Sequence, residues 1–140
     1  MEDRQYSGPY HDQTSFDSLK ERIKKQGFMG IRIISDSMDP FIQVGEEVTV
    51  SEFVNNKQLQ RFTPILYWDG KKLVCHYFWN QSRIPNADGK QTIVTRSLKQ
   101  TKSNDVPVPI ENILGIVVGR KLSAMKRISI LLSNIFSSTG

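Results

Sequence analysis

The 140-residue chain has one cysteine, two histidines and no long apolar run. With Cys75 as the only thiol, it can form neither an internal disulfide nor a cysteine-rich metal site. No window approaches the roughly 18 apolar residues that a membrane-spanning helix needs, and the polar start MEDRQYSGPYHDQ is unlike a secretory signal. We therefore expect a single domain with no metal or other cofactor, located in the cytoplasm or at a membrane surface.

Charge is distributed unevenly along the chain. Residues 1–60 hold 7 basic and 10 acidic side chains, whereas residues 61–140 hold 12 basic and 4 acidic ones. A positive surface can face nucleic acid, an anionic membrane or an acidic partner. The basic residues never form runs longer than two, which favours an ordinary solvated surface, and we expect no nucleic-acid partner.

Apolar periodicity predicts one helix followed by five or six strands. Residues 1–14 are expected to form a flexible tail. Residues 15–27 have helical spacing, with Ser15 as the expected cap and Gly27 at the end. The spacing then becomes that of strands, and Asp69-Gly70 is typical of a hairpin turn. Strands are expected within residues 28–35, 46–53, 62–68, 71–79, 91–98 and 112–121. This pattern predicts a mainly β domain over residues 15–120, either a small barrel or a coiled sheet.

Residues 121–140 return to helical spacing and predict an amphipathic helix. Basic residues flank its apolar stripe, which consists of Leu122, Met125, Ile128, Leu132 and Ile135, with Phe136 beside it. A basic amphipathic helix can lie on a membrane surface. It can equally pack against the domain or a second copy of the chain. Residues 121–136 therefore predict either peripheral membrane contact or a packed helix, as in a homodimer.

Ser37 and His76 are the first candidates for chemistry. Ser37 lies at a polar hinge between two apolar runs, and a serine hydroxyl needs a nearby base to act as a nucleophile. Of the two histidines, His11 lies in the expected tail and His76 in the expected strand 71–79. Strand alternation sends His76 and Cys75 to opposite faces, which argues against a cysteine nucleophile. From these residues alone, a turn serine and a core histidine remain the plainer interpretations.

The segment SDSMDPFIQVGEEVTV resembles the nucleophile motif of the S24/S26 serine peptidases, the superfamily of type I signal peptidases and self-cleaving SOS repressors. That motif reads Ser-Gly-Ser-Met-x-Pro, then Gly-Asp-x-Val-x-Val. The residues in register here are Ser35, Ser37, Met38, Pro40, Gly45, Val48 and Val50. Asp36 stands where the family has glycine, and Glu46 replaces its aspartate.

The likeness continues over residues 28–120. DGKKLVCHYF resembles the family hairpin whose return strand carries a histidine base, with His76 at the base position and Tyr77 in place of arginine. NDVPVP and NILGIVV resemble the Asp-x-Pro-Val loop and Ile-Leu-Gly strand of such relatives, which puts Asp105 at the third position. The Gly-Asp that ends the preceding strand in those relatives is absent here.

The resemblance implies the curled antiparallel sheet or small β-barrel of these proteases, and a serine endopeptidase. Ser37 would be the nucleophile, His76 the general base and Asp105 the residue that orients the imidazole. The Ser35 hydroxyl and the Ser37 N–H would stabilise the oxyanion. A peptide or maturing protein would bind as an added β-strand, in contact with Ile33, Met38, Pro40, Leu66 and Tyr67.

Two other functions stay open. A catalytically inactive member would keep the fold and cleft as a peptide- or protein-binding module, an alternative that Asp36, Tyr77 and the absent Gly-Asp motivate. A self-cleaving repressor would need a DNA-binding domain, an Ala-Gly or Cys-Gly site upstream of the serine, and a lysine base. The residues before the first expected strand contain neither the domain nor the site, so this function ranks last.

Overall fold

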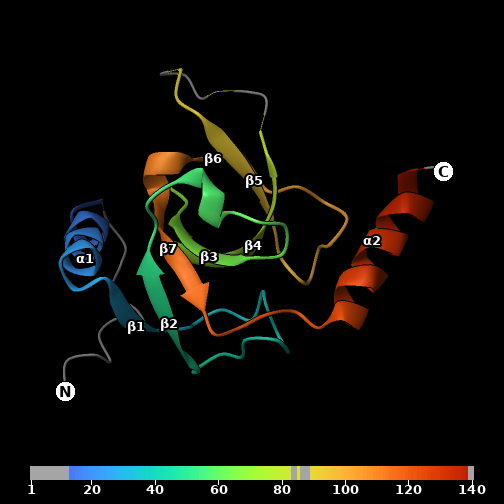
Figure 1. Cartoon of the computed structure of the whole chain (residues 1–140), viewed down its shortest axis with the longest axis horizontal. Helices are drawn as coiled ribbons and strands as arrows, with labels where there is room; N and C mark the ends of the chain where they lie inside the picture. Colours follow the sequence, from blue (N-terminus) through green and yellow to red (C-terminus); the bar gives the residue numbers. More distant parts are fainter. Residues whose placement is uncertain (1–12, 83–84, 86–88, 139–140) are drawn as a thin grey trace.

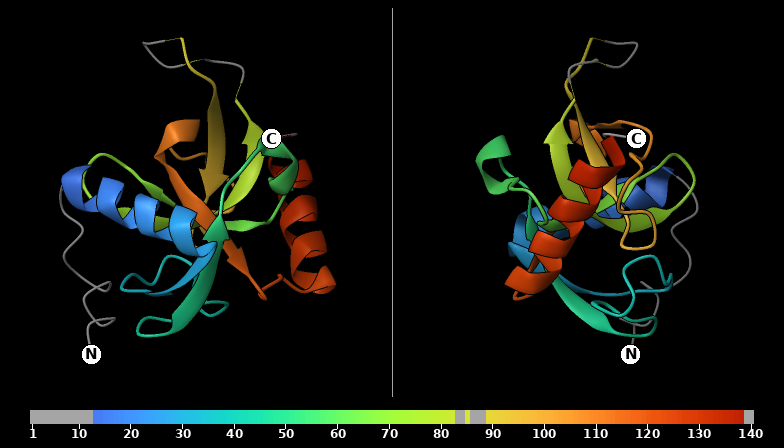
Figure 2. Two further views of the ribbon diagram at one scale, coloured as in Figure 1. Left: turned by 60° about the vertical axis from the view of Figure 1, so that its left-hand side comes forward. Right: turned by 90° about the vertical axis from the view of Figure 1, so that its right-hand side faces the viewer.

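A computed structural model describes residues 13–82, 85 and 89–138. Seven strands in this part of the chain form one antiparallel sheet that curls into a half-barrel, in the order β1-β2-β7-β3-β4-β5-β6. Helices α1 and α2 lie at opposite ends of the sheet (Figures 1 and 2). The element bounds are α1 Gln13–Gln26, β1 Phe28–Arg32, β2 Glu47–Glu52, β3 Pro64–Trp68, β4 Leu73–Gln81, β5 Thr92–Arg96, β6 Val108–Pro109, β7 Ile113–Val118 and α2 Ala124–Ser138, with single 3-10 turns at Asn56–Gln58 (η2) and Ile110–Asn112 (η3). The expected mainly β class is confirmed.

Helix α1 forms because one of its faces is apolar, and it ends at a glycine. Phe16, Leu19 and Ile23 are almost fully buried, and Gly27 has a φ of +85°, a conformation that favours glycine and ends the helix. The expected start at Ser15 lies two residues too late. The helix begins at Gln13, so Ser15 lies inside it rather than capping it. His11 and residues 1–12 lie outside the described ranges.

Every strand expected from periodicity is present, and one short strand was not expected. Strand β6 lies in the segment NDVPVP, where a loop was predicted, and pairs Val108 with Ile93. It forms the edge of the sheet beyond β5, the position at which proline, lacking an N–H, is tolerated. The hairpin turn at Asp69-Gly70 is confirmed. Gly70 has a φ of +102°, and the Asp69 carboxylate accepts the N–H groups of Lys71 and Lys72 at 2.8 and 2.9 Å.

The two faces of the curled sheet bury separate apolar clusters. Cys75 and Tyr77 of β4 belong to the larger cluster together with α1. Phe78 belongs to the smaller cluster, and Val74 packs against it. The predicted alternation along β4 therefore holds, and His76 shares a face with Val74. Neither α1 nor α2, the long helices of the described part, combines the length and apolar character needed to cross a membrane.

Strand β7 lies between β2 and β3. Gly115 allows β7 to approach β2 closely. A Cβ at Gly115 would meet the backbone oxygen of Ser51, and would lie 2.5 Å from Cγ1 of Val50. The Ser51 oxygen belongs to the backbone of β2, so it cannot move without displacing that strand. The close contact between β2 and β7 thus depends on the absence of a side chain at Gly115.

We expect Gly115→Ala to lower the free energy of unfolding by about 1–3 kcal/mol, because the added methyl overpacks the centre of the sheet. Gly30→Ala is the matched control. Its Cβ would meet only the end of the exposed Glu47 side chain, which can move aside, so its stability should stay within about 0.5 kcal/mol of wild type. Urea unfolding measures both values, and equal losses would contradict the assigned role of Gly115.

Candidate functional site

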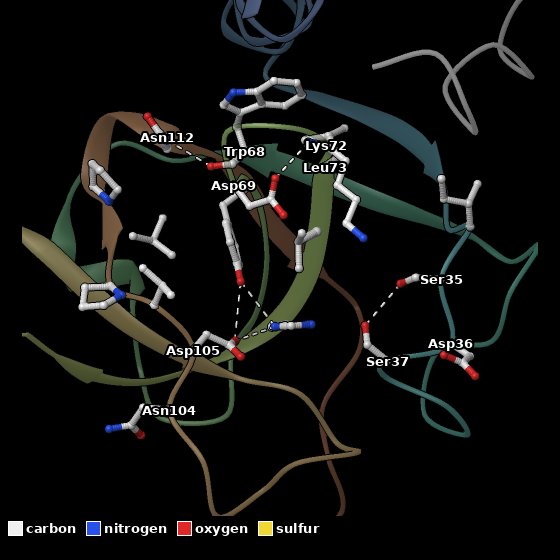
Figure 3. A pocket seen from close by; sticks show the side chains of 18 residues that line it. Ser35, Asp36, Ser37, Trp68, Asp69, Lys72, Leu73, Asn104, Asp105 and Asn112 are labelled. Atoms are coloured by element: carbon white, nitrogen blue, oxygen red, sulfur yellow. Dashed lines mark hydrogen bonds and ion pairs between the residues drawn. The ribbon is translucent and has the colours of Figure 1, made fainter. Parts of the chain in front are cut away.

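A pocket of about 930 Å3 opens beside the start of β4. Its walls come from the segment that follows β1, from the β3–β4 hairpin and from the loop that precedes β6 (Figure 3). The lining residues are 34–37, 67–69, 72–74, His76, 104–109 and Asn112. The pocket thus gathers side chains from segments that are far apart in the sequence.

The Ser37 segment is held on both sides by backbone hydrogen bonds and buried side chains. The Ile33 N–H donates to Glu46 O at 2.9 Å, and the Leu98 N–H donates to Ser37 O at 3.0 Å. Directly after Ser37, the side chain of Met38 is buried in the larger cluster. These contacts fix the half-buried Ser37 in the pocket wall. In Figure 3, Ser35 and Ser37 face one another across from Asp105.

His76 and Asp105 form the closest polar pair in the pocket. His76 Nδ1 and Asp105 Oδ2 lie 2.6 Å apart, and both side chains are mostly buried. The Asp105 loop is fixed by its own N–H, which donates to Thr95 O at 3.0 Å. The Thr95 hydroxyl donates to the same Asp105 oxygen at 2.7 Å. Tyr67 also approaches, with its hydroxyl 3.5 Å from that oxygen and 3.3 Å from His76 Nδ1.

This network keeps Asp105 ionised and sets the histidine tautomer. Burial acts to raise the pKa of Asp105, but hydrogen bonds from His76 and Thr95 outweigh it, and the pKa lies below the ordinary value. A carboxylate can only accept, so the Nδ1 of His76 carries the proton. In the neutral imidazole the lone pair is then on Nε2, which has no partner among the described residues and is the nitrogen through which a general base would act. Burial raises the pKa of Tyr67, which remains a neutral phenol.

Ser37 is not hydrogen-bonded to His76 in this structure, although both line the pocket. The Ser37 hydroxyl donates to Cys75 O at 3.3 Å and lies 3.2 Å from the Ser35 hydroxyl. An activating contact with His76 Nε2 therefore requires the Ser37 side chain to rotate. Such contacts are commonly long in ligand-free sites and tighten only when substrate binds.

Asp36 and Tyr77, two of the residues that differ from the motif the sequence resembles, form no hydrogen bond with Ser37 or His76 in the described part of the chain. Asp36 is 71% exposed and lies 3.6 Å from Lys99, with its carboxylate directed away from Ser37 (Figure 3). Tyr77 is fully buried on the opposite face from His76 and packs against Phe62. Burial raises the pKa of Tyr77 to about 12, and its hydroxyl has no partner among the described residues. Tyr77 thus serves packing where the family has arginine.

Of the five residues expected to contact substrate, one lines the pocket. Tyr67 lines the pocket, whereas Ile33, Met38 and Leu66 are buried in the larger core cluster. Pro40 is exposed and is not among the lining residues. Alternation explains the shift, because it turns the neighbour of a residue in the larger cluster to the other face: Ile34 rather than Ile33, and the buried Tyr67 rather than Leu66. The other apolar lining residues are Trp68, Leu73, Val74, Val106, Pro107, Val108 and Pro109.

The start of β4 presents an unpaired backbone edge to the pocket. Strand β4 pairs with β3 from Leu73 onward, but its pairing with β5 begins only at Tyr77. Lys72 O and Phe78 N bond toward β3, so the backbone groups of Leu73 and Cys75 point the other way. The hydrogen bond from Ser37 to Cys75 O agrees with this direction. An extended peptide could therefore pair with this edge beside Ser37.

Thr95 was not anticipated from the sequence, although strand alternation in TIVTRSL could have raised it as a polar residue on a buried face. Within the described ranges, no group of three or more His, Cys, Asp or Glu side chains is arranged to hold a metal ion. Comparisons of the chain with protein-family models, with curated proteins and with solved structures find no match. The chemistry of the site is therefore argued from its own residues and geometry.

We expect Asp105→Asn to destabilise the protein at neutral pH but not in acid. The pKa of Asp105 in the folded protein lies below the ordinary value of 3.8, so the ionised carboxylate stabilises the fold above that value. This stabilisation is lost as the pH falls through the folded-state pKa. The difference in free energy of unfolding should be about 1–3 kcal/mol near pH 7 and should narrow below about pH 4, as measured by urea unfolding.

Asp36→Asn is the matched control, because that carboxylate is exposed and its ion pair with Lys99 is solvated. Its free energy of unfolding should stay within about 0.5 kcal/mol of wild type at each pH. A loss in Asp105→Asn that is the same at acid and neutral pH would contradict the ionised role of Asp105.

Proposed function

We propose that this chain is a serine endopeptidase of the signal-peptidase-like S24/S26 type, with Ser37 as nucleophile and His76 as general base. The observation that carries the proposal is the 2.6 Å contact between His76 and Asp105 in a pocket that Ser37 also lines. The motif resemblance, drawn from the sequence alone, assigns nucleophile, base and orienting acid to these same three residues. Their meeting in one pocket supports that assignment.

The reaction follows from the state of each group. Ser37 Oγ attacks the carbonyl carbon of the scissile peptide bond, and its proton passes to His76 Nε2. Asp105 stabilises the resulting imidazolium through Nδ1–H. The oxyanion accepts hydrogen bonds from the Ser37 N–H and the Ser35 hydroxyl. His76 then gives its proton to the leaving amine, and water, deprotonated by His76, hydrolyses the acyl-enzyme.

Substrate binding supplies a reason for Ser37 to rotate. A peptide or a segment of a maturing protein would add as a strand along Leu73–Cys75, and its N–H would bond to Cys75 O. The Ser37 hydroxyl would then lose its present acceptor and would turn to His76. In this mechanism the nucleophile is activated only when an extended backbone occupies the pocket.

A peptide-binding module without turnover is the second candidate. The observation in its favour is that Ser37 bonds to Cys75 O rather than to His76. In that case the unpaired edge of β4 would still bind an extended peptide, but the Ser37 hydroxyl would keep its acceptor. The two candidates share a binding mode and differ in the reactivity of Ser37.

A fluorophosphonate probe tests that reactivity without knowledge of the substrate. The probe forms a bond between phosphorus and an activated serine oxygen and releases fluoride. We expect one label per wild-type chain, on the peptide that contains Ser37, and none in Ser37→Ala. His76→Ala should slow labelling by about 10^3-fold or more, because the base is lost. Intact mass and fragment spectra measure both results.

Ser103→Ala is the matched control, because Ser103 is exposed and lies outside the pocket lining. Its labelling should equal that of wild type. An unlabelled wild type, or a label that persists in Ser37→Ala, would remove Ser37 as nucleophile. Circular dichroism of each variant distinguishes lost reactivity from lost folding.

Hydrolysis of a pooled peptide library separates the two candidates. We expect wild type to cleave members of the pool, and His76→Ala to bind them without cleaving, because His76 acts on the proton and not on the added strand. Binding is measured by fluorescence anisotropy and cleavage by mass spectrometry. If wild type binds the peptides without cleaving them, it has no peptidase activity on that pool, and the result favours the peptide-binding module.

A further inference from the structure

The inner face of α2 contacts the rest of the molecule through few side chains, several of them polar. Ile130 is buried at 3% exposure. One turn further on, Asn134 Oδ1 accepts from Arg96 Nη1 at 2.6 Å, and Asn134 Nδ2 donates to Thr101 O at 3.1 Å. Arg96 in turn lies over the Trp79 ring at 4.2 Å. These contacts orient α2 against the end of β5 and the loop that follows it (Figure 1).

The most apolar face of α2 is the one that points to solvent. Five large apolar side chains are at least one-third exposed, namely Met125, Ile128, Leu131, Leu132 and Ile135, and together they form the α2 stripe. Met125 is 83% exposed. The residues recur at the three- and four-residue spacing of one helical face. A helix that served only to cover its own domain would turn this face inward, so the α2 stripe is suited to an external partner.

The charges around the α2 stripe are all of one sign. Residues 119–138 contain four basic side chains and no acidic one. Arg120 is paired with Glu46, but Lys121 and Lys126 form no ion pair within the described residues. Lys102 of the neighbouring loop is exposed and likewise has no ion pair there. The surroundings of the stripe are therefore positive and uncompensated.

We propose that α2 binds an anionic membrane surface, with the α2 stripe inserted at the boundary between headgroups and acyl chains. An apolar helical face beside lysines is the pattern of an interfacial helix, which gains from apolar burial and from attraction to anionic lipid. A second copy of the chain fits less well. Two α2 stripes packed together would bring their lysines near each other with no acidic residue in residues 119–138 to pair with them.

Membrane binding by the full chain is tested with vesicles of phosphatidylcholine and phosphatidylglycerol, and with phosphatidylcholine alone. We expect wild type to co-sediment with the anionic vesicles and to bind the neutral ones more weakly. The double variant Ile128→Ser/Leu132→Ser should lose about tenfold or more in affinity for the anionic vesicles, since two buried side chains are removed from the interface. Because both positions are exposed, thermal unfolding should be unchanged.

Two matched controls separate the α2 stripe from general surface effects. Val44→Ser/Val54→Ser removes two equally exposed apolar side chains elsewhere and should bind as wild type does. Lys121→Gln/Lys126→Gln should weaken binding to the anionic vesicles by about fivefold for each lysine, and not weaken binding to the neutral ones. The same change at Lys24 and Lys25 of α1 should have little effect.

Two results would overturn the proposal. The first is a failure of the membrane-binding test: either wild type does not bind the anionic vesicles, or Ile128→Ser/Leu132→Ser binds them as tightly as wild type does. The second is a dimer without vesicle binding. If sedimentation equilibrium detects a wild-type dimer that is lost in Ile128→Ser/Leu132→Ser, the α2 stripe binds a second copy of the chain. The proposal does not depend on the peptidase function, because Ser37→Ala should bind vesicles as wild type does.

Discussion

The half-buried carboxylate of Asp105 is the group on which the arrangement of the site depends. A charge at this depth is costly unless donors surround it, and the donors come from three strands that are neighbours in the sheet. They are Tyr67 on β3, His76 on β4 and Thr95 on β5. Compensating the charge therefore ties the loop before β6 to the sheet. The same contact leaves Nε2 of His76 as the free ring nitrogen.

Local pattern was enough to predict the strands, the Asp69-Gly70 turn and the mainly β class. Each of these depends on a few adjacent residues, whose side chains alternate or whose backbone needs a particular φ. The insertion of β7 between β2 and β3 was not predicted, because it is a pairing between distant segments. Strand β6 was missed for a similar reason. Two residues, one of them proline, form a strand only because β5 lies beside them.

In the candidate site, too, some features could be predicted from the sequence and others depend on contacts between distant segments. The motif resemblance pointed to Ser37, His76 and Asp105, and the pocket contains all three. Of the residues expected to contact substrate, only Tyr67 lines the pocket, because alternation along an extended segment decides which neighbour faces it, and Ile33 faces the core. The Thr95 hydroxyl was missed because its bond to Asp105 joins two elements whose separation only the folded sheet defines.

The site and the α2 stripe are physically connected through residues 97–104. Leu98 holds the backbone oxygen of Ser37, while Thr101 accepts a hydrogen bond from Asn134 of α2. A membrane that held α2 would therefore hold this loop, and the adjacent Ser37 segment, close to the headgroups. A peptide segment tethered to the same membrane would meet the unpaired edge of β4 at a raised effective concentration. Weak backbone pairing would then be sufficient for capture, since the membrane, rather than side-chain contacts alone, brings the two together.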